Sequence, residues 1–214
     1  AGDRVLIAVE SQRDYGISDE LAQLMTTSGS TGSPKFVRQT EENLRTNSSA
    51  IRDYLEITPG DRAITTLPMS YSYGLSIINS HLISGASIVM NQASVTQKDF
   101  WKLLNVSGAN NFGGVPYLFD VLGRMKVLKD EFKSLRYITQ AGGKLASQTF
   151  GKMLEMCNGI NLPLVLMYGQ TEASPRMSYL PSEMLSTKGQ SIGVPIPGGR
   201  FWLEDERGRV IKEH

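Results

Sequence analysis

Cysteine, histidine and net charge are all scarce in this chain of 214 residues. The single cysteine, Cys157, excludes an internal disulfide, and its amphipathic surroundings, FGKMLEMCNG, favour a buried structural thiol over a nucleophile. With 2 histidines, His81 and His214, a zinc site and a Ser-His-Asp triad both have little support. Lys and Arg number 22 against 21 Asp and Glu, so the net charge of +1 gives no general attraction for nucleic acid or an anionic membrane.

Long apolar runs and a signal peptide are lacking as well. No stretch approaches the length of a membrane span, and the N-terminus has no basic segment followed by an apolar one. We therefore expect a cytoplasmic protein without a membrane span. Hydrophobic residues make up 40% of the chain and charged residues 20%, which is the balance of a globular protein with a sizeable core.

The spacing of apolar residues predicts strands that alternate with helices. The expected strands are 5–9, 21–27, 36–40, 63–67, 87–90, 111–115, 135–141 and 163–168. The expected helices are 41–55 with Thr40 as its cap, 74–84, a helix within 96–104 that a capping box of Thr96 and Asp99 would start, 116–125, and 147–158. Repeated β-α-β units predict an α/β fold with a mainly parallel sheet, helices on both faces, and ligands at the carboxyl ends of the strands.

A Pro- and Gly-rich stretch, GVPIPGG, predicts a boundary near the C-terminus. We expect one α/β domain over 1–192 and the start of a hairpin-rich segment over 193–214, where FWLEDERGRVIKEH has the pattern of a strand, a turn and a returning strand.

The most unusual segment is LMTTSGSTGSPKFV, 24–37. Its Ser, Thr and Gly residues offer hydroxyl and N–H donors after an expected strand, and Lys35 follows them. Such a loop suits phosphate oxygens, although the same composition also makes flexible linkers. It is not the common phosphate loop, because Pro34 and Phe36 replace residues which that motif requires. The residues alone leave both interpretations open.

Two further loops follow expected strands. The glycines of QAGGK, 140–144, would let a flat group approach the main chain, or form only a turn. YGQTEAS, 168–174, brings an aromatic ring, a hydroxyl and a carboxylate to a strand end, although Thr171 and Glu172 could simply be the cap and first turn of a helix. With the first loop, these make three donor-rich loops on one expected edge of one sheet.

TTSGSTGSPK and YGQTEAS resemble two signature motifs of the AMP-forming adenylating enzymes, the superfamily of acyl-CoA synthetases, peptide-synthetase adenylation domains and beetle luciferase. TLPMSYSYGL, GGVPYLF, LRYITQAGGKL and GQSIGVPIPGGRFWLEDERGRV resemble the stretches between and after them, in the same order. The resemblance runs from about Leu21 onward and corresponds to the central part of the large N-terminal, nucleotide-binding domain.

The resemblance implies a role for several groups of residues. Those expected around the β- and γ-phosphates are Thr27, Ser28, Gly29, Ser30, Thr31 and Gly32. Those expected beside the adenine are Gly142, Gly143, Lys144, Tyr168 and Gly169, with Lys144 standing where many relatives have a small residue. The expected catalytic residues are Thr171 at the α-phosphate, Glu172 as the Mg²⁺ ligand, and Lys35 as a mobile cation. The expected acyl pocket comprises Tyr71, Tyr73, Gly74, Gly114 and Val115, although both tyrosines could instead be core aromatics.

The implied activity is that of an ATP-dependent ligase. By resemblance, it would join a carboxylate to the α-phosphate of ATP, release pyrophosphate, and pass the acyl group to CoA or to the phosphopantetheine thiol of an acyl or peptidyl carrier protein. ATP and Mg²⁺ are the expected cofactors. The ribose-binding Asp, the hinge and the C-terminal domain with the catalytic Lys should follow His214, so we expect a truncated fragment that is inactive by itself. The alternative is a nucleotide-binding or interaction module that has lost catalysis.

Overall fold

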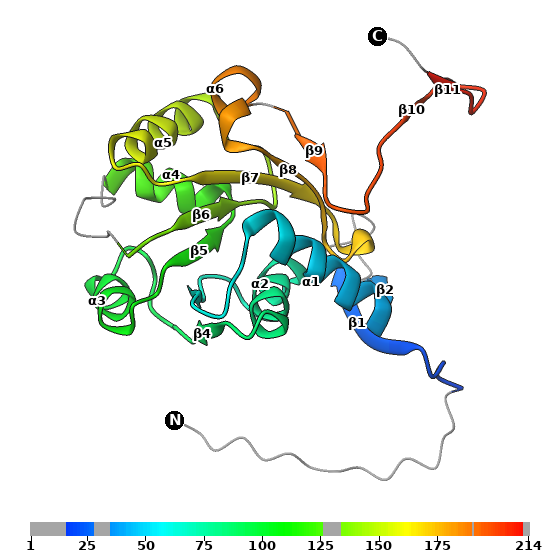
Figure 1. Cartoon of the computed structure of the whole chain (residues 1–214), viewed down its shortest axis with the longest axis horizontal. Coiled ribbons are helices and arrows are strands. Elements are labelled where there is room, and N and C mark those ends of the chain that lie inside the picture. Colours follow the sequence, from blue (N-terminus) through cyan, green and yellow to red (C-terminus); the bar gives the residue numbers. More distant parts are fainter. Residues whose placement is uncertain (1–15, 28–34, 126–133, 190, 212–214) are drawn as a thin grey trace.

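The structure is a computed structural model, which describes residues 16–27, 35–125, 134–189 and 191–211. A seven-stranded sheet forms its centre (Figure 1). In spatial order the strands are β4 (Ser87–Val89), β3 (Arg62–Ile64), β5 (Asn111–Gly114), β6 (Tyr137–Gln140), β7 (Leu164–Gly169), β8 (Arg176–Leu180) and β9 (Val194–Pro195). The first five pair in parallel, and β8 and β9 are antiparallel additions at one edge. The mainly parallel α/β sheet predicted from the sequence is confirmed.

Helices cover both faces of this sheet. The helices are α1 (Glu41–Leu55), α2 (Ser72–Ile83), α3 (Lys98–Ser107), α4 (Pro116–Met125), α5 (Ser147–Gly159) and the short α6 (Leu185–Lys188). Successive residues of β6 face opposite sides: Ile138 packs with apolar residues of α3, α4 and α5, whereas Tyr137 packs with those of α1. Cys157 lies among the apolar residues that pack around Ile138. Burial raises the pKa of its thiol to about 12, which agrees with a structural role and not with that of a nucleophile.

The segment around the first loop departs from the expected arrangement. β1 (Leu21–Thr27) and β2 (Lys35–Thr40) form a separate two-stranded antiparallel sheet. The expectation that all three donor-rich loops follow strands of one sheet is therefore wrong for the first of them. Of the two faces of β1, the one that carries Met25 is buried, whereas Leu24 on the other is half exposed. The hairpin packs onto α1 and onto η2 (Thr171–Ala173), a turn of 3₁₀ helix after β7.

Helix starts were predicted with mixed success. Thr40 caps α1 as expected, because its hydroxyl accepts from the Asn43 N–H while the Asn43 side chain accepts from the Thr40 N–H. The predicted capping box of Thr96 and Asp99 is wrong. Gln97 occupies the cap position of α3, but its side chain makes no hydrogen bond to the first turn of the helix. The Thr96 hydroxyl donates to Ser94 instead, in a polar turn that precedes the helix. The Thr96 hydroxyl thus has its hydrogen-bond partner within the turn and does not cap the helix.

The C-terminal segment contains the predicted hairpin. β10 (Leu203–Glu204) and β11 (Val210–Ile211) pair in antiparallel fashion and extend away from the central sheet (Figure 1). β9 still pairs with β8, and the domain boundary near 192 stays a prediction. The expected strand 5–9 lies outside the described residues. In the part of the chain that is described, no helix is long and apolar enough to cross a membrane.

Candidate active site

Two of the donor-rich loops line one cavity at the carboxyl ends of β6 and β7. These strands are parallel neighbours, so their carboxyl ends meet at the same edge of the sheet. The cavity has a volume of about 440 Å³. Its lining includes every residue that was expected beside the adenine: Gly142, Gly143, Lys144, Tyr168 and Gly169.

The shape of this cavity suits a flat group. Gly142 and Gly143 have φ angles of 80° and 152°, which side-chain-bearing residues rarely adopt, so the wall that they form is bare main chain. A Cβ atom on Gly142 would lie 2.6 Å from the Tyr71 hydroxyl oxygen and 3.0 Å from Val115 Cγ1. The ring of Tyr168 is 42% exposed, which leaves an aromatic surface available for stacking. An adenine fits between such a ring and such a backbone.

Thr171 is held in place by two side chains from distant elements. It is the first residue of η2 and not its cap, which is Gln170. The Thr171 hydroxyl lies 3.0 Å from the Ser72 hydroxyl at the start of α2, and the Gln39 side-chain amide donates to the Thr171 carbonyl at 2.8 Å. The start of α2, the hairpin and the loop after β7 therefore meet at this residue.

Glu172 lines a different cavity from the loops that were expected to bind adenine. This open cavity of about 750 Å³ lies between α1, η2 and the turn 196–199, and Arg38 and Arg45 also line it. Glu172 is exposed, and among the described residues no group of three or more His, Cys, Asp or Glu residues is arranged so that it could hold a metal ion. A single carboxylate fits Mg²⁺ when phosphate oxygens and water supply the other ligands. Of the two arginines, Arg45 is paired with Glu42 at 2.6 Å, and Asp53 lines the same cavity.

The described ends of the first loop belong to the hairpin that contacts Thr171 through Gln39. Thr27 ends β1 and Lys35 begins β2, and the two residues pair across the hairpin. Both are accessible, and β1 lies against η2. The other residues expected around the phosphates lie outside the described residues: Ser28, Gly29, Ser30, Thr31 and Gly32.

The tyrosines of the expected acyl pocket have different surroundings. Tyr71 is half-buried, is the N-cap residue of α2 and lies next to Gly142. Tyr73 is a core aromatic: its hydroxyl donates to the Thr139 carbonyl at 3.0 Å, and the Arg176 guanidinium lies 4.4 Å above its ring. Burial raises the pKa of Tyr73 to about 12.

The remaining expected acyl-pocket residues are Gly74, Gly114 and Val115. Gly74 is buried where α2 packs on the preceding loop, because a Cβ there would lie 2.4 Å from the Pro68 carbonyl oxygen. Gly114, also buried, ends β5, and half-buried Val115 follows it.

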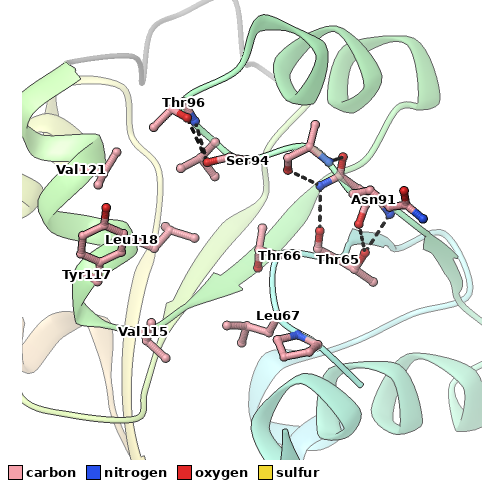
Figure 2. Close-up of a pocket in the computed structure, with 14 residues that line it drawn as sticks. Thr65, Thr66, Leu67, Asn91, Ser94, Thr96, Val115, Tyr117, Leu118 and Val121 are labelled. Atoms are coloured by element: carbon pink, nitrogen blue, oxygen red, sulfur yellow. Dashed lines mark hydrogen bonds between the residues drawn. The ribbon is translucent and has the colours of Figure 1, made fainter. Parts of the chain in front are cut away.

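A third cavity, of about 510 Å³, opens beside Val115 (Figure 2). It lies at the carboxyl ends of β3, β4 and β5, on the edge of the sheet that also carries the loops 140–144 and 168–174. It is lined by two loops and by one side of α4: Thr65, Thr66, Leu67, Pro68, Asn91, Gln92, Ala93, Ser94, Val95, Thr96, Val115, Tyr117, Leu118 and Val121. Of these residues, only Val115 was expected in an acyl pocket.

Several residues that shape the site were missed from the sequence. Ser72 and Gln39 contact Thr171 across 99 and 132 positions of the chain, and Arg38 shares a cavity with Glu172. A polar residue next to a loop motif is a weak signal, because its partner is fixed only by the tertiary fold. Arg38 and Gln39 do occupy adjacent positions just after the first loop, which was the available hint.

Comparisons with known proteins give consistent relatives. The family described as AMP-binding enzyme matches residues 8–214. Malformin synthetase mlfA from Aspergillus homomorphus is 30% identical over 191 residues, which are 89% of this chain and 4% of that protein. Luciferin 4-monooxygenase from Nipponoluciola cruciata is 30% identical over 168 residues, which are 76% of this chain and 30% of that protein.

Solved structures of one enzyme match both the fold and the sequence. O-succinylbenzoate coenzyme A synthetase from Bacillus subtilis in complex with AMP is 29% identical, with a TM-score of 0.78, over 91% of this chain and 39% of that one. Its complex with ATP and a magnesium ion gives a TM-score of 0.77 at 28% identity, over 88% of this chain and 38% of that one. The chain thus spans less than half the length of each of these relatives.

Proposed function

Because this chain belongs to the AMP-binding enzyme family, we propose that the protein joins a carboxylic acid to the α-phosphate of ATP and releases pyrophosphate. One observation carries this proposal: the bare backbone at Gly142–Gly143, the exposed ring of Tyr168 and the hydroxyl of Thr171 come together at one edge of the sheet. ATP and magnesium are bound in solved complexes of a relative, in agreement with the chemistry of these groups.

Each residue has a defined part in the proposed binding of ATP. Tyr168 stacks on the adenine, which approaches Gly142 and Gly143 from the other side. Thr171 donates to the α-phosphate, and the Ser72 and Gln39 contacts fix its position before the substrate arrives. Thr27 and the residues that follow it donate to the β- and γ-phosphates, with Lys35 as an additional cation.

Glu172 is proposed as the protein ligand of Mg²⁺. The ion, when bound, neutralises the charge that pyrophosphate gains as it leaves. Arg38 also lines the cavity of Glu172 and brings a positive charge to it, whereas Arg45 is paired with Glu42 at 2.6 Å.

The proposed reaction has two steps. A carboxylate oxygen attacks the α-phosphorus of ATP, the bond to the β-phosphate breaks, and pyrophosphate carries away the electron pair. A thiolate then attacks the carbonyl carbon of the acyl-adenylate, and AMP leaves with the oxygen that came from the carboxylate. We propose the thiol of CoA or of a carrier-protein phosphopantetheine as this acceptor, and the cytoplasm as the location.

The test is carboxylate-dependent exchange of pyrophosphate into ATP by the complete gene product. Glu172→Gln keeps the size of the side chain but removes its charge, so exchange should fall about 100-fold or more. Thr27→Ala should reduce exchange less, because neighbouring donors cover for one lost hydroxyl. Glu183→Gln, at another exposed carboxylate in the short helix η3 (Ser182–Met184), is the matched control and should be fully active.

Two outcomes would contradict the proposal. If Glu172→Gln exchanges as well as Glu183→Gln, Glu172 is not the metal ligand. If the unmodified protein exchanges with none of a broad panel of acids but still binds ATP, the protein is a nucleotide-binding module without this catalysis.

A further inference from the structure

We propose that the cavity of Figure 2 holds the tail of the carboxylic acid, and that this tail is uncharged. This inference rests on the proposed function and adds the class of acid to it. The substrate would be a carboxylic acid with an aliphatic or otherwise neutral tail, and not one with an ammonium or a second carboxylate at the far end of the tail.

The position of the cavity supports this assignment. Val115 lines it. Val115 Cγ1 also lies 3.0 Å from the position that a Cβ atom of Gly142 would occupy. Gly142 in turn lines the cavity proposed for adenine. The two cavities are therefore neighbours on one edge of the sheet, separated at Val115. An acid whose carboxylate lies beside the α-phosphate can extend past Val115 into the cavity of Figure 2.

The lining offers apolar surface from three sides. Leu67 comes from the loop after β3, Val95 from the loop after β4, and Leu118 and Val121 from α4 (Figure 2). Tyr117, also on α4, lines the cavity and is 76% exposed, so it lies at the opening of the cavity to solvent. These side chains favour a tail that gains from leaving water.

The polar side chains of the lining are largely engaged with the protein itself. The Asn91 amide nitrogen donates to the carbonyls of Thr65 and Ala93, at 3.1 and 2.8 Å, and its side-chain oxygen accepts from the Ala93 N–H at 2.9 Å. The Thr65 hydroxyl accepts from the Asn91 N–H, and the Thr66 hydroxyl donates to the Gly113 carbonyl. These groups hold the two loops together, while Gln92, Ser94 and Thr96 add neutral polar surface to the lining.

No described residue that lines this cavity is an Asp, Glu, Lys, Arg or His. An ammonium or a second carboxylate on the tail would leave water without gaining an ion partner, which is strongly unfavourable. The lining thus selects against acids with a second charged group at the far end of the tail, by leaving that charge unpaired.

The experiment measures pyrophosphate exchange by the complete gene product with straight-chain monocarboxylic acids of increasing length. The value of kcat/KM should rise about four-fold for each added methylene until the cavity is full. Analogues with a terminal amine or carboxylate should be about 100-fold poorer or worse than the neutral acid of equal length.

Two variants locate the tail. Val121→Phe fills part of the cavity and should move the preferred length to shorter acids while the shortest acids keep their activity. Val106→Phe makes the same change on α3, where Val106 is 79% exposed and does not line the cavity, and should alter nothing. Tyr117→Ala, at an exposed position that the core does not need, should weaken long acids and leave short ones unchanged.

Different results overturn different claims. If Val121→Phe and Tyr117→Ala keep the length profile of the unmodified protein, or if charged tails are preferred, the tail lies elsewhere. If these variants exchange normally with every acid but lose the later transfer to a thiol, the cavity belongs to the acceptor. If the unmodified protein exchanges with no acid, the proposed function fails and this inference fails with it.

Discussion

His81 is a buried histidine whose contacts fix its protonation. It lies on α2 and is 1% exposed. Its Nδ1 donates to the Ile77 carbonyl at 2.8 Å, and its Nε2 accepts from the Asn111 side-chain amide at 3.1 Å. A further hydrogen bond from the Asn111 amide to the Asn110 side-chain oxygen orients that amide. A second proton would place two donors opposite each other. Burial is the main cause that lowers the pKa of His81 below its ordinary value of 6.5.

The pH dependence of stability should report this histidine. Below about pH 6.5 the unfolded chain binds a proton at residue 81 that the folded chain excludes. The free energy of unfolding should therefore fall as the pH drops from about 7.5 to 5.5, by at most about 1.4 kcal/mol per pH unit from this group. Urea unfolding across this range measures the slope. In His81→Gln the slope should be smaller; equal slopes in the two proteins would contradict the account.

Arg176 explains why Tyr73 belongs to the core. The guanidinium is 2% exposed and lies over the Tyr73 ring, and its Nη1 donates to the Tyr54 hydroxyl at 3.0 Å. Among the described residues, its Nε has no hydrogen-bond partner and no carboxylate pairs with it. The aromatic rings supply the principal compensation for this buried charge. Nothing in SYSYG predicted this contact, since Arg176 is far along the chain.

At the scale of elements, the two predicted helix caps give a direct comparison. Thr40 was predicted as a cap by itself and Thr96 as part of a capping box with Asp99. Both have a polar residue three positions later, yet only the cap at α1 formed. β2 ends at Thr40 and α1 begins at Glu41, so no turn separates the strand from the helix. Before α3, Ser94 accepts from both the backbone and the hydroxyl of Thr96. The local pattern was the same, and the neighbouring turn decided the outcome.

Alanine substitutions should separate these two threonines. Thr40→Ala removes the bond to the Asn43 N–H and should lower the free energy of unfolding by about 1 kcal/mol. Thr96→Ala removes only an exposed contact with Ser94 and should change it by less than about 0.5 kcal/mol. Chemical denaturation of both variants provides the measurement. A cost at Thr96 equal to that at Thr40 would show that Thr96 caps α3 after all.

The order of elements was largely predictable, because each helix and strand carries its own apolar period. Strands β5 to β7 and helices α1, α4 and α5 lie where that period placed them. The position of the β1–β2 hairpin was not predictable in this way. A short strand with an alternating pattern can pair in a large sheet or in a hairpin, and only the packing of β1 against η2 decides between them.

At the scale of the whole molecule, the site follows from the topology of the sheet. Parallel strands bring the loops after β6 and β7 to one edge, so the group around Gly142 and Tyr168 could be predicted from two separate motifs. Of the cavity of Figure 2, the sequence predicted only Val115. Parts of its lining lie in TLPMSYSYGL and GGVPYLF, but the loop 91–96 belongs to no quoted stretch, and only the fold brings the three segments together. Binding surfaces made by shape alone leave little trace in one sequence.

The central claim is that a carboxylate oxygen of the substrate attacks the α-phosphorus of ATP. Transfer of ¹⁸O tests it most directly: the complete gene product is given an acid labelled in both carboxylate oxygens, ATP, Mg²⁺ and a thiol acceptor, and the products are analysed by mass spectrometry. The account predicts one ¹⁸O atom in each AMP released and none in pyrophosphate. Label in inorganic phosphate with ADP as the other product, or AMP without label, would contradict it.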